Sequence, residues 1–312
     1  MKTIPVLTVT AWLTCQLATP AVAEPQTRRA KPPTFSASQR AIFFSDVQSV
    51  LVGPRPDFGQ LAASRPQTGG PAADQESSEA SEEWSRLVST DAVETEIKRQ
   101  AQRVAQATAT ATAFKGGGYR DARDAFSMLA LAFRLAAEHN DDARWRDIAP
   151  GLSSLFARAA ANCKVGTDGS YREAAARSQD LADLVRGGRP DAPAGEPDQL
   201  WSDLADRSPI MRRIEDAQQK RLGPLMGSSA SFSRSAEDAA HEAQVLAFLS
   251  EVLTREEFID AGDEEYDGYA RAMRDAAADI SRAADQGDYQ SARDAYGRLN
   301  KACSDCHDLY RG

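Results

Sequence analysis

The stretch Tyr289–Tyr310, which reads YQSARDAYGRLNKACSDCHDLY, determines the fold class that we expect for this chain. Its apolar and aromatic residues recur at alternating steps of three and four, the spacing that forms one continuous stripe along an α-helix. The stripe consists of Tyr289, Ala292, Tyr296, Leu299, Cys303, Cys306 and Tyr310. We therefore expect a C-terminal helix with one buried face, and both cysteines lie on that face.

Residues 303–307 of this helix read Cys-Ser-Asp-Cys-His, which is the C-x-x-C-H spacing by which haem is attached covalently. Two thiols add across the vinyl groups of one porphyrin, and the adjacent imidazole can then bind the iron as proximal ligand. We therefore expect Cys303 and Cys306 to carry one covalent haem c, and His307 to bind its iron.

Two other uses of a C-x-x-C pair fit the sequence less well. A zinc site would need a second pair of soft ligands, but the remaining cysteines, Cys15 and Cys163, are isolated. A thioredoxin-like site would follow a strand of a βαβ unit, whereas this motif lies late in an alanine-rich helical segment. Cys163 itself is expected to be a small buried apolar residue.

The first 23 residues have the order of a secretory signal peptide, with Lys2, an apolar run at residues 4–17, and Ala21-Val22-Ala23 at the cleavage site. Cleavage after Ala23 would remove Cys15. No other segment is long and apolar enough to cross a bilayer. We therefore expect an exported, periplasmic protein with no membrane span in the mature chain.

The chain has a formal net charge of −9, and it has no cluster of cations of the kind that binds nucleic-acid phosphates. We therefore expect no nucleic-acid partner. An acidic surface suits a basic redox protein, but it is also ordinary for solubility, so the charge does not identify a partner. The chain lacks G-x-S-x-G, a phosphate-binding glycine loop and H-E-x-x-H, and we expect no enzymatic activity.

The organisation of the chain follows from changes in composition. Residues 24–80 are rich in Pro, Ser, Gln and Gly, and we expect them to be flexible. Within them, Phe43 and Phe44 belong either to a short docking helix or to a local apolar cluster. From residue 82 onward the two-residue alternation of strands is absent, so we expect an all-α protein. A Pro/Gly-rich linker at 188–204 separates residues 81–187 from residues 205–312.

The two helical halves show traces of a duplication, which favours two four-helix bundles in tandem. Residues 168–171 correspond to residues 286–289, and Leu129-Ala130 corresponds to Leu246-Ala247. In this alignment the haem motif has no counterpart in the first half, which we expect to be haem-free. The positions aligned with Cys303, Cys306 and His307 are Val185, Gly188 and Arg189.

A four-helix domain with residues 303–311 on its last helix resembles cytochrome c′ and its methionine-ligated, low-spin relatives. Residues 240–243, Ala-His-Glu-Ala, are similar to part of the second helix of that family. The resemblance covers residues 205–312 well and residues 82–187 only as a degenerate copy. It implies a periplasmic haem protein that exchanges electrons with a redox protein partner or, in five-coordinate members, binds small gases such as nitric oxide. It also implies a homodimer through the first two helices, unless the haem-free bundle takes that place.

The resemblance also implies that the distal side of the iron faces the first helix, where Met211 and Ile214 lie three residues apart on one face. A thioether from Met211 would saturate the iron and suit electron transfer, whereas an apolar residue would leave the iron open to a diatomic ligand. The comparison does not decide between the two residues. In the haem-free half, Val93 occupies the position of Met211.

Other polar residues have alternative interpretations. His241 is a second candidate for the distal ligand, but we expect it at the edge of its helix or in a local hydrogen bond. Arg311 lies four residues after His307 and is a candidate partner of a haem propionate. Tyr310 is expected in the core and His139 on the surface. A third hypothesis makes the protein chiefly an interaction module in which haem is secondary.

Overall fold

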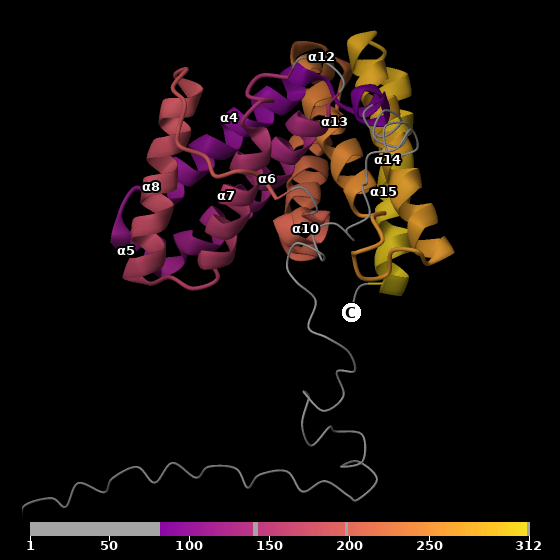
Figure 1. The fold of residues 1–312 in the computed structure, drawn as a ribbon. Helices are drawn as coiled ribbons and strands as arrows, with labels where there is room; N and C mark the ends of the chain where they lie inside the picture. Colours follow the sequence, from indigo (N-terminus) through magenta and orange to yellow (C-terminus); the bar gives the residue numbers. More distant parts are fainter. Residues whose placement is uncertain (1–81, 140–142, 197–198, 311–312) are drawn as a thin grey trace, which may run out of the picture. The chain divides into compact units, whose positions relative to one another are not determined.

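A computed structural model describes residues 82–139, 143–196 and 199–310. Helices account for most of these residues, and none of them forms a β-strand, so the described part of the protein is all-α (Figure 1). No helix among them is long and apolar enough to cross a membrane. The expected signal peptide, the segment with Phe43 and Phe44, and Arg311 lie outside the described residues.

The first half contains four long helices. Within it, α6 packs against α4 and α7, and α8 contacts both of these. The phenyl ring of Phe156 stacks on those of Phe126 and Phe133, at centroid distances of 5.9 and 5.5 Å, and all three residues are fully buried. The last helix, α8, contains no cysteine or histidine. The bounds are α4 Thr90–Ala107, α6 Tyr119–Glu138, α7 Ala149–Asn162 and α8 Asp168–Val185, with the short α5 Ala111–Ala113 and η2 Phe114–Gly118 before α6.

The second half begins with a helical rod and continues with three long helices, of which α14 packs along both α13 and α15. Gly287 separates α14 from α15 with a φ of 68°, and the backbone N–H groups of Gly287 and Asp288 cap the end of α14. The rod comprises α10 Arg207–Glu215, η3 Asp216–Leu222 and α11 Gly223–Leu225, and the other helices are α9 Trp201–Leu204, α12 Ser229–Arg234, α13 Ala236–Val252, α14 Glu264–Asp285 and α15 Tyr289–Tyr310.

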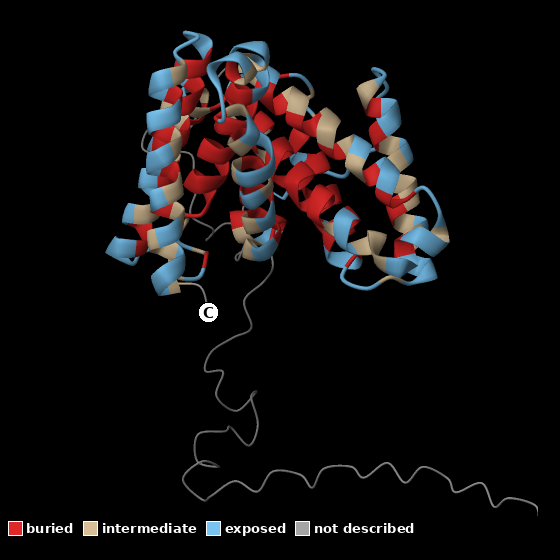
Figure 2. Ribbon diagram, turned by 180° about the vertical axis from the view of Figure 1, so that it is seen from behind, coloured by how far each residue is buried: buried red, intermediate tan, exposed pale blue. Residues whose placement is uncertain are grey.

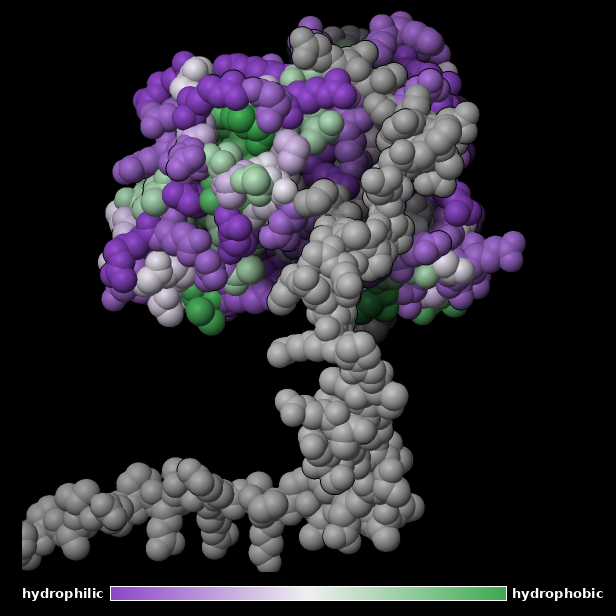
Figure 3. All heavy atoms as spheres, in the orientation of Figure 1, coloured by the Kyte–Doolittle hydropathy of each residue, from purple (hydrophilic) through white to green (hydrophobic). Residues whose placement is uncertain are grey.

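The halves share one hydrophobic core and fall within one compact unit. Helix α6 contacts α10, and α4 contacts α13, so the first two helices of each half form the contact (Figure 1). The rings of Trp84, Trp201 and Phe248 pack within 5.4 to 6.0 Å of one another and join the halves at a second place. Buried residues follow the facing sides of the helices (Figure 2). On the face drawn in Figure 3, hydrophilic residues dominate and the apolar patches are separate.

The residues of the two halves that align in sequence also lie in corresponding helices, counted along each half. Leu129 and Leu246 are both buried, in the second long helix of their halves, α6 and α13. Residues 168–171 lie at the start of α8, and residues 286–289 lead into α15. The duplication itself stays a prediction, because the helix order is also compatible with two unrelated bundles.

Two expectations about single residues are wrong, and one is confirmed. His139, expected on the surface, is fully buried, with its Nε2 2.7 Å from the carbonyl oxygen of Val88. Tyr310, expected in the core, is only partly buried, because its hydroxyl donates a hydrogen bond to Asp263 at the outer end of the bundle. Cys163 is buried, as the sequence indicated, and burial raises the pKa of its thiol to about 12.

Candidate functional site

Helix α15 holds the three residues of the C-x-x-C-H motif in fixed relative positions. Cys303 and Cys306 are one turn apart and partly buried, and His307 follows Cys306 on the exposed side of the helix. The helix is stabilised at its start by the side chain of Asp288, which accepts a hydrogen bond from the backbone N–H of Ser291. The motif thus lies on a regular helix, where backbone geometry determines the spacing of the three side chains.

An open groove of about 640 Å³ separates α15 from the rod of α10 and η3. Cys303 and His307 line it from α15, while Met211 and Ile214 line it from α10. Pockets for small molecules and cofactors commonly have volumes of roughly 300–1,000 Å³. The groove therefore has the size of a cofactor site, and it brings Met211 and Ile214 close to Cys303 and His307.

A smaller apolar cavity of about 30 Å³ lies next to the groove and extends toward α14. Met211, Ile214, Cys303 and His307 also line this cavity, and Cys306 joins them there. The structure therefore brings both distal candidates close to the motif and does not select between them.

Met273 of α14 is a further residue at this site. It is buried and lines the small cavity, with its Sδ 3.5 Å from the Sγ of Cys303. Only the packing of α14 against α15 connects Met273 with the motif. Burial raises the pKa of Cys303 to about 11 and also raises that of Cys306, so both thiols are neutral at pH 7.

Tyr266 places an unsatisfied polar atom at the site. Its side chain is 1% exposed, lines the small cavity beside Cys306, and its hydroxyl has no hydrogen-bond partner among the described residues. A buried hydroxyl without a partner costs free energy, so native proteins usually satisfy it. Burial raises the pKa of Tyr266 to about 12, which keeps the hydroxyl a donor. A polar group of a bound molecule is the simplest partner for it.

Two arginines lie at the edge of the groove, and the sequence analysis did not predict either of them as a site residue. Arg207 lies 5.0 Å above the ring of Tyr266 and donates a hydrogen bond of 2.6 Å to Asp260. Arg212 also lines the groove and binds Asp124 of α6. Both guanidinium groups lie at the edge of the groove, and each is paired with a carboxylate of the protein, Asp260 or Asp124.

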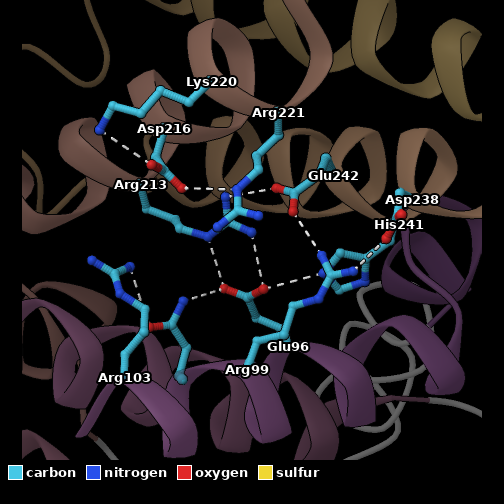
Figure 4. A network of polar contacts seen from close by, with 11 residues as sticks. Glu96, Arg99, Arg103, Arg213, Asp216, Lys220, Arg221, Asp238, His241 and Glu242 are labelled. Atoms are coloured by element: carbon cyan, nitrogen blue, oxygen red, sulfur yellow. Dashed lines mark hydrogen bonds and ion pairs between the residues drawn. The ribbon is translucent and has the colours of Figure 1, made fainter. Parts of the chain in front are cut away.

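His241 does not belong to this site. It is buried in α13, and its Nε2 lies 3.2 Å from Glu96 of α4, in a network of charged residues between the halves (Figure 4). It lines neither the groove nor the small cavity. The expectation of a helix edge or a local hydrogen bond is therefore wrong, because its partner comes from the other half of the chain.

The residues present fit a covalent haem. The cysteines are free, a histidine follows the second of them, and a thioether lies across the groove. The unsatisfied hydroxyl of Tyr266 offers a hydrogen-bond donor to a bound molecule. This donor set is that of a c-type haem site.

Comparison with known proteins agrees with this chemistry. Residues 257–311 match the family model described as cytochrome c′. The match covers α14 and α15, including Cys303, Cys306 and His307, but no part of the first half. No curated protein and no solved structure matches the chain. Residues 257–311 are therefore similar to the cytochrome c′ family, whose members are c-type haem proteins.

Proposed function

We propose that this protein is an exported cytochrome that carries one covalent haem c and transfers electrons. The observation that carries the proposal is that Met211 of α10 lines the same groove and the same cavity as His307 of α15. A methionine thioether and a histidine imidazole together saturate haem iron and favour electron transfer. Proteins of the cytochrome c′ family are typically exported, which agrees with the signal-like N-terminus.

Each nominated residue has a separate role in this proposal. Cys303 and Cys306 tether the porphyrin, and the imidazole of His307 binds the iron. The thioether of Met211 would be a second protein ligand of the iron and would exclude other ligands. The hydroxyl of Tyr266 and the guanidinium of Arg207 stabilise carboxylates of the porphyrin through hydrogen bonds and charge. Bound haem supplies a one-electron couple between ferric and ferrous iron.

A second candidate function is the binding of small gases, and the position of Ile214 favours it. Ile214 is buried and lines both the groove and the cavity, as Met211 does. If Ile214 rather than Met211 faced the iron, the distal side would be apolar and open to carbon monoxide or nitric oxide. The two functions therefore differ in one measurable property, the accessibility of ferrous iron.

The test is the optical spectrum of the reduced protein with and without carbon monoxide. Electron transfer with Met211 as ligand predicts a spectrum that carbon monoxide leaves unchanged in the wild type. Met211→Leu conserves the volume and removes the sulfur, so this variant should acquire the response. Met273→Leu is the matched control, because it removes a sulfur from α14 and should leave the spectrum unchanged.

Other results of the carbon monoxide experiment would support a different function or a different iron ligand. A wild type that binds carbon monoxide supports the gas-binding function. A response that appears in Met273→Leu but not in Met211→Leu moves the ligand to α14. A protein without covalent haem, after production in a host competent for cytochrome c assembly, refutes both functions.

We also propose that the protein has a redox protein as its partner and no enzymatic activity. We infer a redox protein as partner, since a saturated iron exchanges electrons without binding a substrate. The third hypothesis, an interaction module, would have the haem-free half as its main functional part. A deletion of that half is a poor test of it, because α4 and α6 cover apolar surface of α10 and α13. Point variants at the contact between the halves are the better approach.

A further inference from the structure

Helix α10 lies between the groove and the haem-free half of the chain. Met211 and Ile214 face the groove, whereas Arg212 and Arg213 bind carboxylates of α6 and α4. Successive residues of an α-helix are about 100° apart around its axis, so Arg213 lies almost opposite Met211. The helix that carries the candidate distal ligand is therefore held from its other side by the haem-free half.

The contact of Arg213 with Glu96 is buried and bidentate. Its Nε and Nη2 donate hydrogen bonds of 2.8 and 2.9 Å to the two carboxylate oxygens, and both side chains are less than 10% exposed. The Nη1 of Arg213 lies 2.8 Å from Glu242 of α13. Figure 4 shows Arg213 between these two carboxylates. Planar arginine–carboxylate pairs have strict geometry, so this pair fixes the position of α10 relative to α4.

Further contacts hold the same helix along its length. Arg212 donates through Nε and Nη2 to both oxygens of Asp124 of α6, at 2.6 and 2.5 Å. Arg123 of α6 forms an ion pair with Asp206, the residue that precedes α10. Three arginine–carboxylate contacts from two helices of the haem-free half thus involve residues 206–213, which are α10 and the residue before it.

An apolar contact between these helices would permit small sliding and rotation, because dispersion and burial are not directional. Bidentate pairs at two neighbouring residues permit neither, since each guanidinium must stay coplanar with its carboxylate. A rotation of α10 that broke them would also move Met211 away from the groove. The haem-free half therefore has a role beyond covering apolar surface.

We propose that Glu96 and Asp124 are positioning residues that hold α10, and with it Met211, against the haem groove. The proposal rests on the proposed function, in which Met211 lies next to the iron. It assigns the haem-free half as an internal clamp on the distal side of the haem. Neither residue touches the groove; each acts through the arginine that it binds.

The test uses the full-length protein with its haem and three variants: Glu96→Gln, Asp124→Asn and the double variant. Asp238→Asn is the matched control, because it removes a contact between the halves, Arg99 with Asp238 at 2.7 Å, that does not involve α10. The measurements are the rate of carbon monoxide uptake by the reduced protein, the midpoint reduction potential, and amide hydrogen exchange in residues 207–222. Of the two single variants, Asp124→Asn is less at risk of misfolding, because Arg212, the partner of Asp124, is half exposed.

We expect the double variant to take up carbon monoxide at least about tenfold faster than the wild type, to shift the reduction potential, and to exchange amides of α10 faster. Asp238→Asn should leave all three unchanged. Glu96→Asp keeps the charge, so its carbon monoxide uptake, reduction potential and amide exchange should lie between those of the wild type and of Glu96→Gln. A folded double variant with wild-type uptake, potential and exchange overturns the clamp, as does an equal change in Asp238→Asn. A wild type without haem, or one in which Met211→Leu has no effect, refutes the proposed function instead.

Discussion

Replacing Arg213 with methionine should destabilise the protein strongly, because it removes a cation that two buried carboxylates share. Glu96 and Glu242 are each less than 10% exposed, and Arg213 lies within 3 Å of both. Glu96 would keep only the donors of Gln100 and His241, and Glu242 would keep Arg99. Removing one partner of a buried ion pair typically costs about 3–5 kcal/mol.

That loss corresponds to a large fall in melting temperature. For a folded unit of this size, 1 kcal/mol changes the melting temperature by about 2–4 °C, so Arg213→Met should lower it by roughly 6–20 °C. Thermal unfolding followed by circular dichroism at pH 7 measures this. Arg186→Met is the matched control, because Arg186 and its partner Asp183 are more than half exposed, and exposed ion pairs contribute little. Equal melting temperatures for the two variants would refute the reasoning.

The pH dependence gives an independent check. Burial disfavours the charge of Glu96, but the charge of Arg213 and hydrogen bonds from Arg213 and His241 outweigh it and hold the pKa of Glu96 well below its usual value. A carboxyl with a lowered folded-state pKa stabilises the fold above its unfolded-state pKa, about 4.3, and this stabilisation is lost as the pH falls through the folded-state value. The difference between wild type and Arg213→Met should therefore be full at pH 7 and shrink below about pH 4.

Three further predictions concern single residues. Gly287→Ala should cost about 1 kcal/mol, because a φ of 68° strains any residue with a Cβ, whereas Gly268→Ala in the regular part of α14 should be neutral or stabilising; thermal unfolding that shows equal effects would contradict this. Cys163 should resist a thiol reagent at pH 8 in the native protein and react after unfolding in guanidinium, because burial raises its pKa to about 12; rapid native labelling would contradict the burial. In protein prepared without haem, Tyr266→Phe should raise the free energy of unfolding by about 1 kcal/mol, since it removes a buried hydroxyl that has no partner among the described residues, and a lower melting temperature would show that the hydroxyl is satisfied.

Much of the candidate site followed from local sequence. The C-x-x-C-H motif and the three-and-four stripe of α15 need only the geometry of one helix, and α15 begins at Tyr289 as the stripe predicts. Met211 and Ile214 were nominated through the family resemblance, and the structure brings both to the groove. Tyr266 and Met273 were not expected at the site, because the apolar pattern of a helix shows which face is buried but not which residues that face contacts.

The histidines show where sequence reasoning failed. His139 was expected on the surface, and His241 was expected at the edge of its helix or in a local hydrogen bond. Each is instead buried against a residue far away in the sequence, Val88 for His139 and Glu96 for His241. Pairing of this kind depends on which helix faces meet, and helix periodicity carries no information about that.

The amino-acid sequence by itself determined that the described chain is helical and that its last helix carries a haem attachment motif, because both depend on spacings of three and four residues along one helix. Only the tertiary structure decided that α10 lies between the groove and the first half of the chain, whose carboxylates bind Arg212 and Arg213. The deciding pair, Arg213 and Glu96, is 117 residues apart in the chain. Such a pair forms only when two amphipathic helices have already buried their apolar faces, which desolvates both charges and makes each depend on the other.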